Sequence, residues 1–449
     1  MDARTMIRSP KSSMFRGIRF LVLAGVAFAW GATASAQSLE RELGTILVDH
    51  PQIQGSMKSI EAARAGINRA RAPMFPKINA VGDSGPEKVD TPTTRSSESG
   101  NDVTRTHIVG GVTVTQNLFN GFATTTQVRT AQISKALAEV TLRGTTQQVL
   151  WEAIQAYVDV LKQKRLIEIG RETERTIQQQ LELEDERVQR GTGITVDVLQ
   201  AKSRLQIAKE KRINYEGALQ DAISKYTQVF NHPPPLETMI DPRVPAELLP
   251  STLEHATEIA LSESPTLANS GANIEMAREK RTLISAEMYP SLDIVGKSNY
   301  EHNKNTVLGT RRDYSLVLQA TWDIFSGFST RAGQTQTAYE YAAVKDNHRQ
   351  AARKVMEQVR IAWQAVLTAR QRVDLLENAV NIAAEVFESR RTLREAGKET
   401  VISVLDAMNE VNNAEINFTG ATYEERVSVF QLLLAMGRLN ANYLGITLE

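Results

Sequence analysis

Cysteine is absent from this 449-residue sequence, and long apolar runs are confined to its N-terminal end. Without thiols, the chain can form neither disulfides nor cysteine-ligated metal sites, so packing must hold its fold. A bacterial lipoprotein needs a cysteine at its processing site, and this chain therefore cannot carry that lipid anchor. No later apolar run reaches the roughly 20 residues that a membrane helix needs, so any membrane part must consist of strands.

Signatures of catalysis are also missing. No H-E-x-x-H, G-x-S-x-G, P-loop or G-x-G-x-x-G motif occurs in the sequence. The six histidines are scattered without metal-ligand spacing. The sequence therefore predicts no catalytic residue, no metal site and no cofactor, and we expect a protein that is not an enzyme.

The N-terminal segment has the composition of a signal peptide. Two arginines precede an apolar run at 20–30, and residues 34–36 form a small-x-small cleavage site. The run is shorter than a membrane span. We predict a signal peptide at 1–36, with translation starting at Met1 or Met14. Its removal takes away five basic residues and one acidic residue, which leaves a net charge of about −4 and disfavours a nucleic-acid partner.

Proline is absent from residues 93–232, which permits a very long helix. From about Thr124 to Gln189 the chain consists of good helix formers, with apolar residues such as Leu150 and Ile154 at helical spacing. A helix of this length is a rod of roughly 100 Å. That length exceeds the size of a compact domain.

The chain is a duplication. The junction Leu118–Phe122 recurs as Ile324–Phe328, and at the same offset Gly191 matches Gly397. The predicted organisation is a first repeat at 37–230, a proline-rich linker at 231–250, a second repeat at 251–438 and a C-terminal tail at 439–449. We expect the linker to be a simple connector and the tail to lie along the outside of the rods.

Each repeat is expected to hold a helical segment, a β-hairpin, a long helix and a shorter returning helix. Proline interrupts the first helical segment of each repeat, near His50-Pro51 and at Pro265. The predicted hairpins cover about 77–118 and 291–324, the long helices about 123–190 and 329–395, and the returning helices about 197–230 and 401–436.

The hairpins are predicted from a change of the apolar period to two residues, which indicates strands with two different faces. In the clearest strand, Tyr314, Leu316 and Leu318 alternate with polar residues. Each strand has about ten residues, the length that crosses a bilayer at a tilt. The loops at about 84–105 and 301–311 are polar and are expected to form solvent-exposed tips.

Aromatic residues near both ends of these strands resemble the two girdles of a membrane barrel. They are Tyr289, Tyr300, Tyr314, Trp322 and Phe325. A soluble sheet packed on one face by the helices is the alternative. Four strands would leave open edges in lipid, so a membrane sheet must close between copies; two copies would supply eight strands and three copies twelve.

The combined pattern resembles the TolC family of outer-membrane channels. The resemblance rests on the signal peptide, the paired hairpins, the two junctions and the turn sequence that joins Gly191 to residues 197–201. It implies a mainly α fold with a transmembrane β portion, in which duplicated repeats form a trimeric 12-stranded β-barrel in the outer membrane and an α-helical barrel in the periplasm.

The same resemblance implies partners and a function. The partners are two further copies, a periplasmic adaptor, outer-membrane lipid, and an inner-membrane ABC exporter or proton-driven pump. The homotrimer would be a passive channel-tunnel for protein or small-molecule substrates. The junctions look more like the type I secretion branch than the lipoprotein drug-efflux branch.

The resemblance also implies a periplasmic gate. The family's ring of acidic residues is matched by Asp406, whereas Ser403 occupies the other position, so a trimer would carry three carboxylates in place of six. A like-charged ring favours cations. Asp197 resembles a family aspartate that latches the closed state, and Arg394 and Glu399 stand near the positions of its partners. The alternative role of Asp197 and Asp406 is a favourable carboxylate at a helix N-terminus.

The resemblance implies adaptor contacts at the helical turns. The residues concerned are Gly191, Gly193, Leu199, Gly397 and Leu405, and turn geometry and packing are their alternative role. The alternative function is a periplasmic coiled-coil adaptor or spacer that forms no pore. Such an adaptor would carry one helical hairpin, whereas this chain carries two equal ones.

Overall fold

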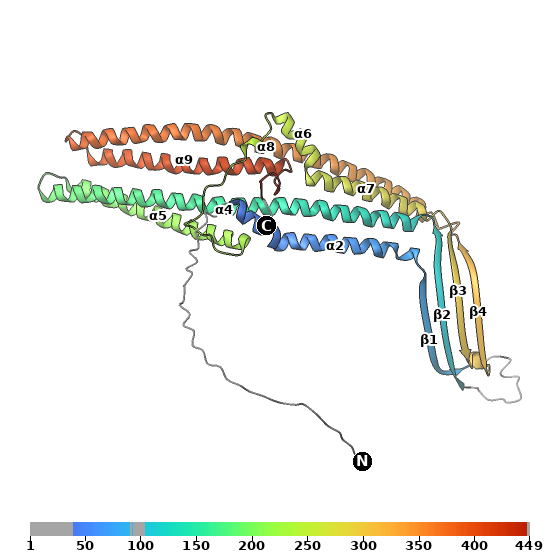
Figure 1. Cartoon of the computed structure of the whole chain (residues 1–449). Helices are drawn as coiled ribbons and strands as arrows, with labels where there is room; N and C mark the ends of the chain where they lie inside the picture. Colours follow the sequence, from blue (N-terminus) through green and yellow to red (C-terminus); the bar gives the residue numbers. More distant parts are fainter. Residues whose placement is uncertain (1–38, 90–91, 93–103, 447–449) are drawn as a thin grey trace, which may run out of the picture. The chain divides into compact units, whose positions relative to one another are not determined.

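The computed structural model describes residues 39–89, 92 and 104–446 (Figure 1). The predicted signal peptide and the central part of the first hairpin loop lie outside these residues. None of the helices within the described part combines the length and the hydropathy needed to cross a bilayer.

Eight α-helices occur in the described residues, four in each repeat. Those of the first repeat are α1 (Leu39–Asp49), α2 (Pro51–Arg71), α4 (Ala123–Gln189) and α5 (Thr195–Phe230). Those of the second are α6 (Leu253–Glu263), α7 (Pro265–Ala286), α8 (Ser329–Glu395) and α9 (Val401–Ala435). Pro51 and Pro265 each open a helix, which confirms the predicted interruptions, because proline suits the first turn of a helix and not its interior.

The sheet has four antiparallel strands in the order β1-β2-β3-β4. They are β1 (Lys77–Lys88), β2 (Thr104–Asn120), β3 (Ser291–His302) and β4 (Thr310–Thr321). The sequence predicted that the first hairpin loop begins near Ser84. This start was wrong, because β1 continues to Lys88. Pro86 interrupts the strand pattern in the sequence, but β1 lies at the edge of the sheet, where proline is tolerated.

The strand register separates an apolar face from a polar face and confirms the predicted alternation. Side chains that lie opposite one another on neighbouring strands share a face. The apolar face includes Ile78, Ala80, Val112, Val114, Ile294, Tyr300, Tyr314, Leu316 and Leu318. The polar face includes Asn79, Asp83, Glu87, His107, Thr113, Asp293, Lys297, Glu301, Asp313 and Gln319. No helix among the described residues covers the apolar face, where Leu316 is 80% exposed.

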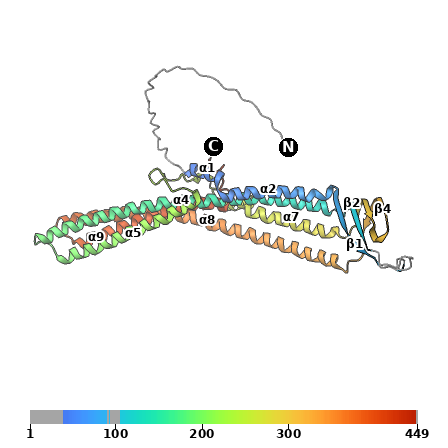
Figure 2. The same ribbon diagram turned by 90° about the horizontal axis from the view of Figure 1, so that it is seen from below.

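The helices follow the order of the strands to which they are joined. Near the sheet, α2 packs on α4, α4 on α7 and α7 on α8. Toward the helical turns, α5 lies beside α4, while α9 contacts both α8 and α4 (Figures 1 and 2). Strand β1 with the preceding α2, and strand β4 with the following α8, therefore lie at corresponding open edges in the described part of the chain.

The two sheet-to-helix junctions have the same geometry. Phe122 and Phe328 cap α4 and α8 in the left-handed conformation, with φ of 70° and 64°. Phe119 and Phe122 form an edge-to-face pair at 5.3 Å, and Phe325 and Phe328 form its counterpart at 5.4 Å. The duplication seen in the sequence is thus repeated in detailed structure.

The main core lies where the two repeats meet midway along the helices. It combines residues of α1, α4, α5, α6, α8 and α9. The prediction that the tail lies outside the rods was wrong, because Leu439 and Ile446 are buried in this core. Arg438 anchors the tail by donating from Nε and Nη2 to the carboxylate of Glu263.

The proline-rich linker is fastened to both repeats, which the sequence did not indicate. The Tyr157 hydroxyl of α4 donates to the Ile240 carbonyl at 2.8 Å. On α9, the Tyr423 hydroxyl lies 3.1 Å from Asp241 Oδ1 and Arg426 Nη1 lies 2.5 Å from the same oxygen. Burial raises the pKa of Tyr157 to about 12, so this donor keeps its proton at physiological pH. The linker therefore straps α4 to α9.

Candidate functional site

The two helical turns have one design. Gly191 and Gly397 both adopt φ of 73°, a left-handed conformation in which an L side chain would be strained. After each glycine, a backbone N–H returns to the last turn of the long helix, from Thr192 to Arg187 and from Lys398 to Leu393, both at 2.9 Å. These are glycine C-caps, so turn geometry alone explains both glycines.

Gly193 is required for packing. A Cβ at this position would lie 2.7 Å from the Val188 nitrogen. No side chain can therefore be added there without moving the end of α4. A role of Gly193 in binding an adaptor stays a prediction.

A second apolar cluster joins the two hairpins beside their turns. Its buried members are Ile177 and Leu181 of α4, Val198, Ala201, Leu205 and Ala208 of α5, and Val401, Leu405 and Met408 of α9. The two leucines at matching positions differ sharply, because Leu199 is 61% exposed and Leu405 only 3%. The prediction of Leu405 as an adaptor contact does not fit this placement, since its side chain is used in the core.

A buried carboxylate that the sequence analysis missed lies above this cluster. Glu184 of α4 has a side chain only 2% exposed. Its Oε1 accepts from Arg394 Nη2 of α8 at 2.7 Å and from Arg187 Nη1 at 3.1 Å. The sequence does contain a sign of this buried carboxylate. Glu184 lies at the next helical step after Ile177 and Leu181, at a position where the apolar seam would normally have an apolar residue.

The Glu184–Arg394 pair connects the long helices of the two repeats. Arg394 also donates from Nη1 to the Glu399 carbonyl at 3.2 Å, so one guanidinium joins α4, α8 and the second turn. Arg394 therefore contacts the Glu399 backbone, and the carboxylate that it binds is Glu184. Asp197 sits in the first turn of α5, and its side chain has no partner within the part of the chain described.

The Asp406 carboxylate forms an ion pair with Arg204 of α5, and the Asp406 side chain remains 52% exposed. Ser403 belongs to the cap of α9, where its N–H donates to Thr400 Oγ1 at 3.2 Å. The Ser403 hydroxyl and the Thr400 backbone also lower the pKa of Glu399. Asp406 therefore lies at the α5–α9 contact and is paired across it, whereas Asp197 and Ser403 lie in the first turns of α5 and α9.

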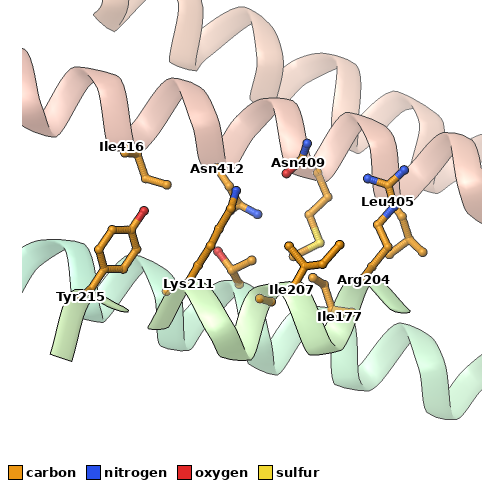
Figure 3. Close-up of a pocket in the computed structure, with 13 residues that line it drawn as sticks. Ile177, Arg204, Ile207, Lys211, Tyr215, Leu405, Asn409, Asn412 and Ile416 are labelled. Atoms are coloured by element: carbon orange, nitrogen blue, oxygen red, sulfur yellow. The ribbon is translucent and has the colours of Figure 1, made fainter. Parts of the chain in front are cut away.

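A cavity of about 200 Å³ lies beside this contact, between α4, α5 and α9 (Figure 3). Ile177, Ile207, Leu405 and Ile416 contribute apolar side chains to its lining. Its polar lining consists of Thr173, Arg204, Lys211, Tyr215, Asn409 and Asn412. Burial raises the pKa of Tyr215. Packing between the hairpins is therefore incomplete at this height.

The predicted aromatic residues are exposed in the single chain. Tyr314 and Phe325 are 76% and 73% exposed, and Tyr289, Tyr300 and Trp322 are also exposed. Trp322 Nε1 donates to the Met288 carbonyl at 3.2 Å, which fixes the ring beside the sheet-to-helix junction. Within the described ranges, no group of three or more histidine, aspartate or glutamate side chains is arranged to hold a metal ion.

Solved structures share this architecture. The chain superposes on a structure of CusC with a TM-score of 0.78 at 14% identity, over 89% of this chain and 92% of that one. It superposes on the outer membrane protein VceC of Vibrio cholerae with a TM-score of 0.76 at 14% identity, over 89% and 96% of the two chains. Identities this low establish the fold alone.

Relatives of known name match nearly the whole chain. The outer membrane protein TolC of Vibrio cholerae is 22% identical over 92% of this chain and 94% of its own length. The alkaline protease secretion protein AprF of Pseudomonas aeruginosa is 23% identical over 84% of this chain and 80% of its own length.

The family profile described as outer membrane efflux protein matches residues 43–229 and 256–438. These two segments coincide with the two repeats and leave out the linker that straps them together. The TolC resemblance read from the sequence is therefore confirmed. The chain belongs to the outer membrane efflux protein family and is an outer-membrane protein of the TolC type.

Proposed function

We propose that this chain is one subunit of a homotrimeric channel-tunnel that passively conducts substrates from an inner-membrane pump to the cell exterior. The observation that carries the proposal is the match between the open edges of the sheet and of the helical layer. In the mature subunit, with residues 1–36 removed, the repeats at 37–230 and 251–438 would each supply one hairpin of the barrel.

The sheet favours closure between copies. Edge strands β1 and β4 have unpaired backbone groups on their outer sides, and each such group costs several kcal/mol in lipid. Pairing β4 of one copy with β1 of the next satisfies them. Three copies of a four-stranded sheet form a twelve-stranded barrel, which is wide enough for a passage.

The helices favour the same closure. On α8, Leu375, Ile382 and Val386 are 70%, 63% and 44% exposed and follow coiled-coil spacing. On α5, at the opposite open edge, Ile213 is 60% exposed. We infer that this face of α5 in one subunit packs on the α8 stripe of the next. The helices would then form a closed cylinder in the periplasm.

The faces of the sheet assign the barrel's inside and outside. The uncovered apolar face would contact lipid, with the exposed aromatic residues at its two boundaries. The polar face, with Lys297 and Asp293 near its centre and inner end, would line the passage. A soluble spacer would instead leave this apolar face in water, an arrangement that promotes aggregation.

The gate is inferred at the contacts between the two hairpins. Glu184–Arg394 and Arg204–Asp406 both connect the first repeat to the second near the turns. Opening would separate these hairpins and take Arg394 away from Glu184, which would keep only Arg187 of its own helix, so opening is costly. The closed state would therefore persist until a partner replaces these contacts. Asp406 would place one carboxylate per subunit at the entrance.

Partners would act at the turns. Gly191, Leu199 and Gly397 are exposed there and form the proposed contact surface for a periplasmic adaptor. An inner-membrane ABC exporter or proton-driven pump would supply the energy. Relatives are named both for protease secretion and for toluene efflux, so the cargo would be a protein or a small molecule.

Single-channel recording in planar bilayers tests the proposal. The purified mature protein should give long-lived conductance steps and should migrate as a trimer before heating. A coiled-coil adaptor or spacer, the alternative function, would give no steps. A monomeric protein without conductance would refute the channel.

A further inference from the structure

The loop between β3 and β4 folds back over the polar face of the sheet. Residues 303–309 contain the short helix η3 (Lys304–Thr306) and three left-handed residues, Asn303, Asn305 and Gly309, with φ of 55°, 55° and 111°. Such a run reverses the chain sharply. As a result η3 contacts β1 and β2, the strands of the other hairpin. Residues 305 and 307–309 still remain exposed, as the predicted solvent-exposed tip requires.

Two polar contacts fasten the loop to the sheet. The Asn305 N–H donates to Glu87 Oε2 of β1 at 2.9 Å, and the Lys304 ammonium pairs with Glu301 of β3. The side chains of Glu87 and Glu301 are only 26% and 17% exposed. Both carboxylates belong to the polar face by register, so the loop covers that face and not its apolar reverse.

A histidine completes this arrangement. His107 of β2 lies with Nε2 2.7 Å from Asp83 Oδ2 and Nδ1 3.8 Å from Glu87 Oε2. It stands between the two β1 carboxylates on the polar face. The loop is therefore held on a preformed set of charged side chains that spans three strands of both hairpins.

We propose that residues 303–309 form a lid over the outer end of the pore. This inference rests on the proposed function, because only a pore lined by the polar face would be narrowed by a loop lying on it. Three copies of the lid would constrict the exit from inside the barrel wall. Loss of the Glu87 contact would let the loop swing outward from the barrel mouth about Asn303 and Gly309.

The first test compares the conductance of the full mature protein with that of Glu87→Ala. The substitution removes the acceptor for the Asn305 N–H and should raise single-channel conductance about twofold, because the narrowest part of a pore dominates its resistance. Asp313→Asn is the matched control, since it removes a carboxylate from the same face without touching the lid. It should leave conductance near the wild-type value. Trimer migration of both variants on gels shows that they fold.

The second test locks the lid. The chain has no cysteine, so Glu87→Cys combined with Asn305→Cys introduces one defined pair. Oxidised protein should show wild-type conductance, and reduction should raise it as Glu87→Ala does. Wild-type steps that neither variant changes would overturn the lid and leave the channel standing. Absence of steps from the wild type itself would overturn the channel and the lid with it.

Discussion

Arg394 on α8 crosses to Glu184 on α4 and places its Nη2 2.7 Å from a carboxylate oxygen that water scarcely reaches. The two residues are far apart in the sequence and lie in different repeats. An ion pair in such surroundings matters most when one partner is lost, because the remaining charge stays buried. The pair therefore makes separation of the hairpins costly.

Replacement of the cation tests this pair. Arg394→Ala should destabilise the contact between the hairpins by about 1.5–3 kcal/mol and increase the open time of the channel, because Glu184 then keeps only Arg187 of its own helix. Single-channel open probability and thermal unfolding measure the two effects. Arg391→Ala, which removes an exposed partner of Glu388 on the same helix, is the control and should change little. Equal behaviour of both variants would count against the latch.

Ion selectivity tests the role of Asp406. Asp406→Ala removes one negative charge per subunit and leaves Arg204 unpaired at the entrance. The ratio of cation to anion permeability should therefore fall by roughly a factor of two or more. Reversal potentials in a salt gradient give this ratio. Glu186→Ala removes a carboxylate of α4 that is 63% exposed and serves as control. An Asp406→Ala channel with wild-type selectivity would exclude Asp406 from the entrance.

The cap of α2 predicts a pH dependence. His50 Nδ1 accepts from the Gln52 N–H at 3.3 Å, which requires a neutral imidazole, and burial lowers the pKa of His50. Because the folded pKa lies below the unfolded value of about 6.5, the cap contributes fully above that pH and is lost as pH falls through the folded pKa. The loss should be about 1 kcal/mol.

Thermal unfolding between pH 5 and 8 measures this effect, with His50→Asn as the comparison. Asparagine caps a helix at every pH in this range, so the variant should lose less stability on acidification than the wild type. Parallel pH profiles would show that the imidazole is not the source.

Neighbouring residues of β4 test which face meets lipid. Leu316 lies on the apolar face and Ser315 on the polar face. Leu316→Lys should reduce membrane insertion, with a cost of about 2–4 kcal/mol for a lysine near the bilayer centre. Ser315→Lys should insert normally. Trimer yield in the outer-membrane fraction distinguishes them, and equal loss in both variants would contradict the assignment of faces.

Periodicity predicted much of this fold from the sequence. The long helices, the proline interruptions and the alternation in β4 depend on local spacing, which a sequence displays directly. The duplication tested each predicted element independently, because each element has a counterpart in the other repeat. On α8, Val359 and Val366 lie seven residues apart, as in a coiled-coil seam, and both are buried.

Other features depend on contacts between distant segments. Leu199 and Leu405 occupy matching positions, yet only their different neighbours decide that one is exposed and the other buried. The seam position of Glu184 is visible in the sequence, but its pairing with Arg394 of the other repeat is not. The fold-back of residues 303–309 depends on Glu87, which lies on another hairpin. Local patterns contain none of these pairings.

The linker strap has a mechanical consequence. Because Ile240 and Asp241 fasten α4 and α9 to one another at a single height, we infer that bending of the helices on the turn side is stopped there. Motion imposed by a periplasmic partner would then be confined to the turn side of the helices. The β-sheet at the other end would stay undisturbed while the entrance at the turns widens.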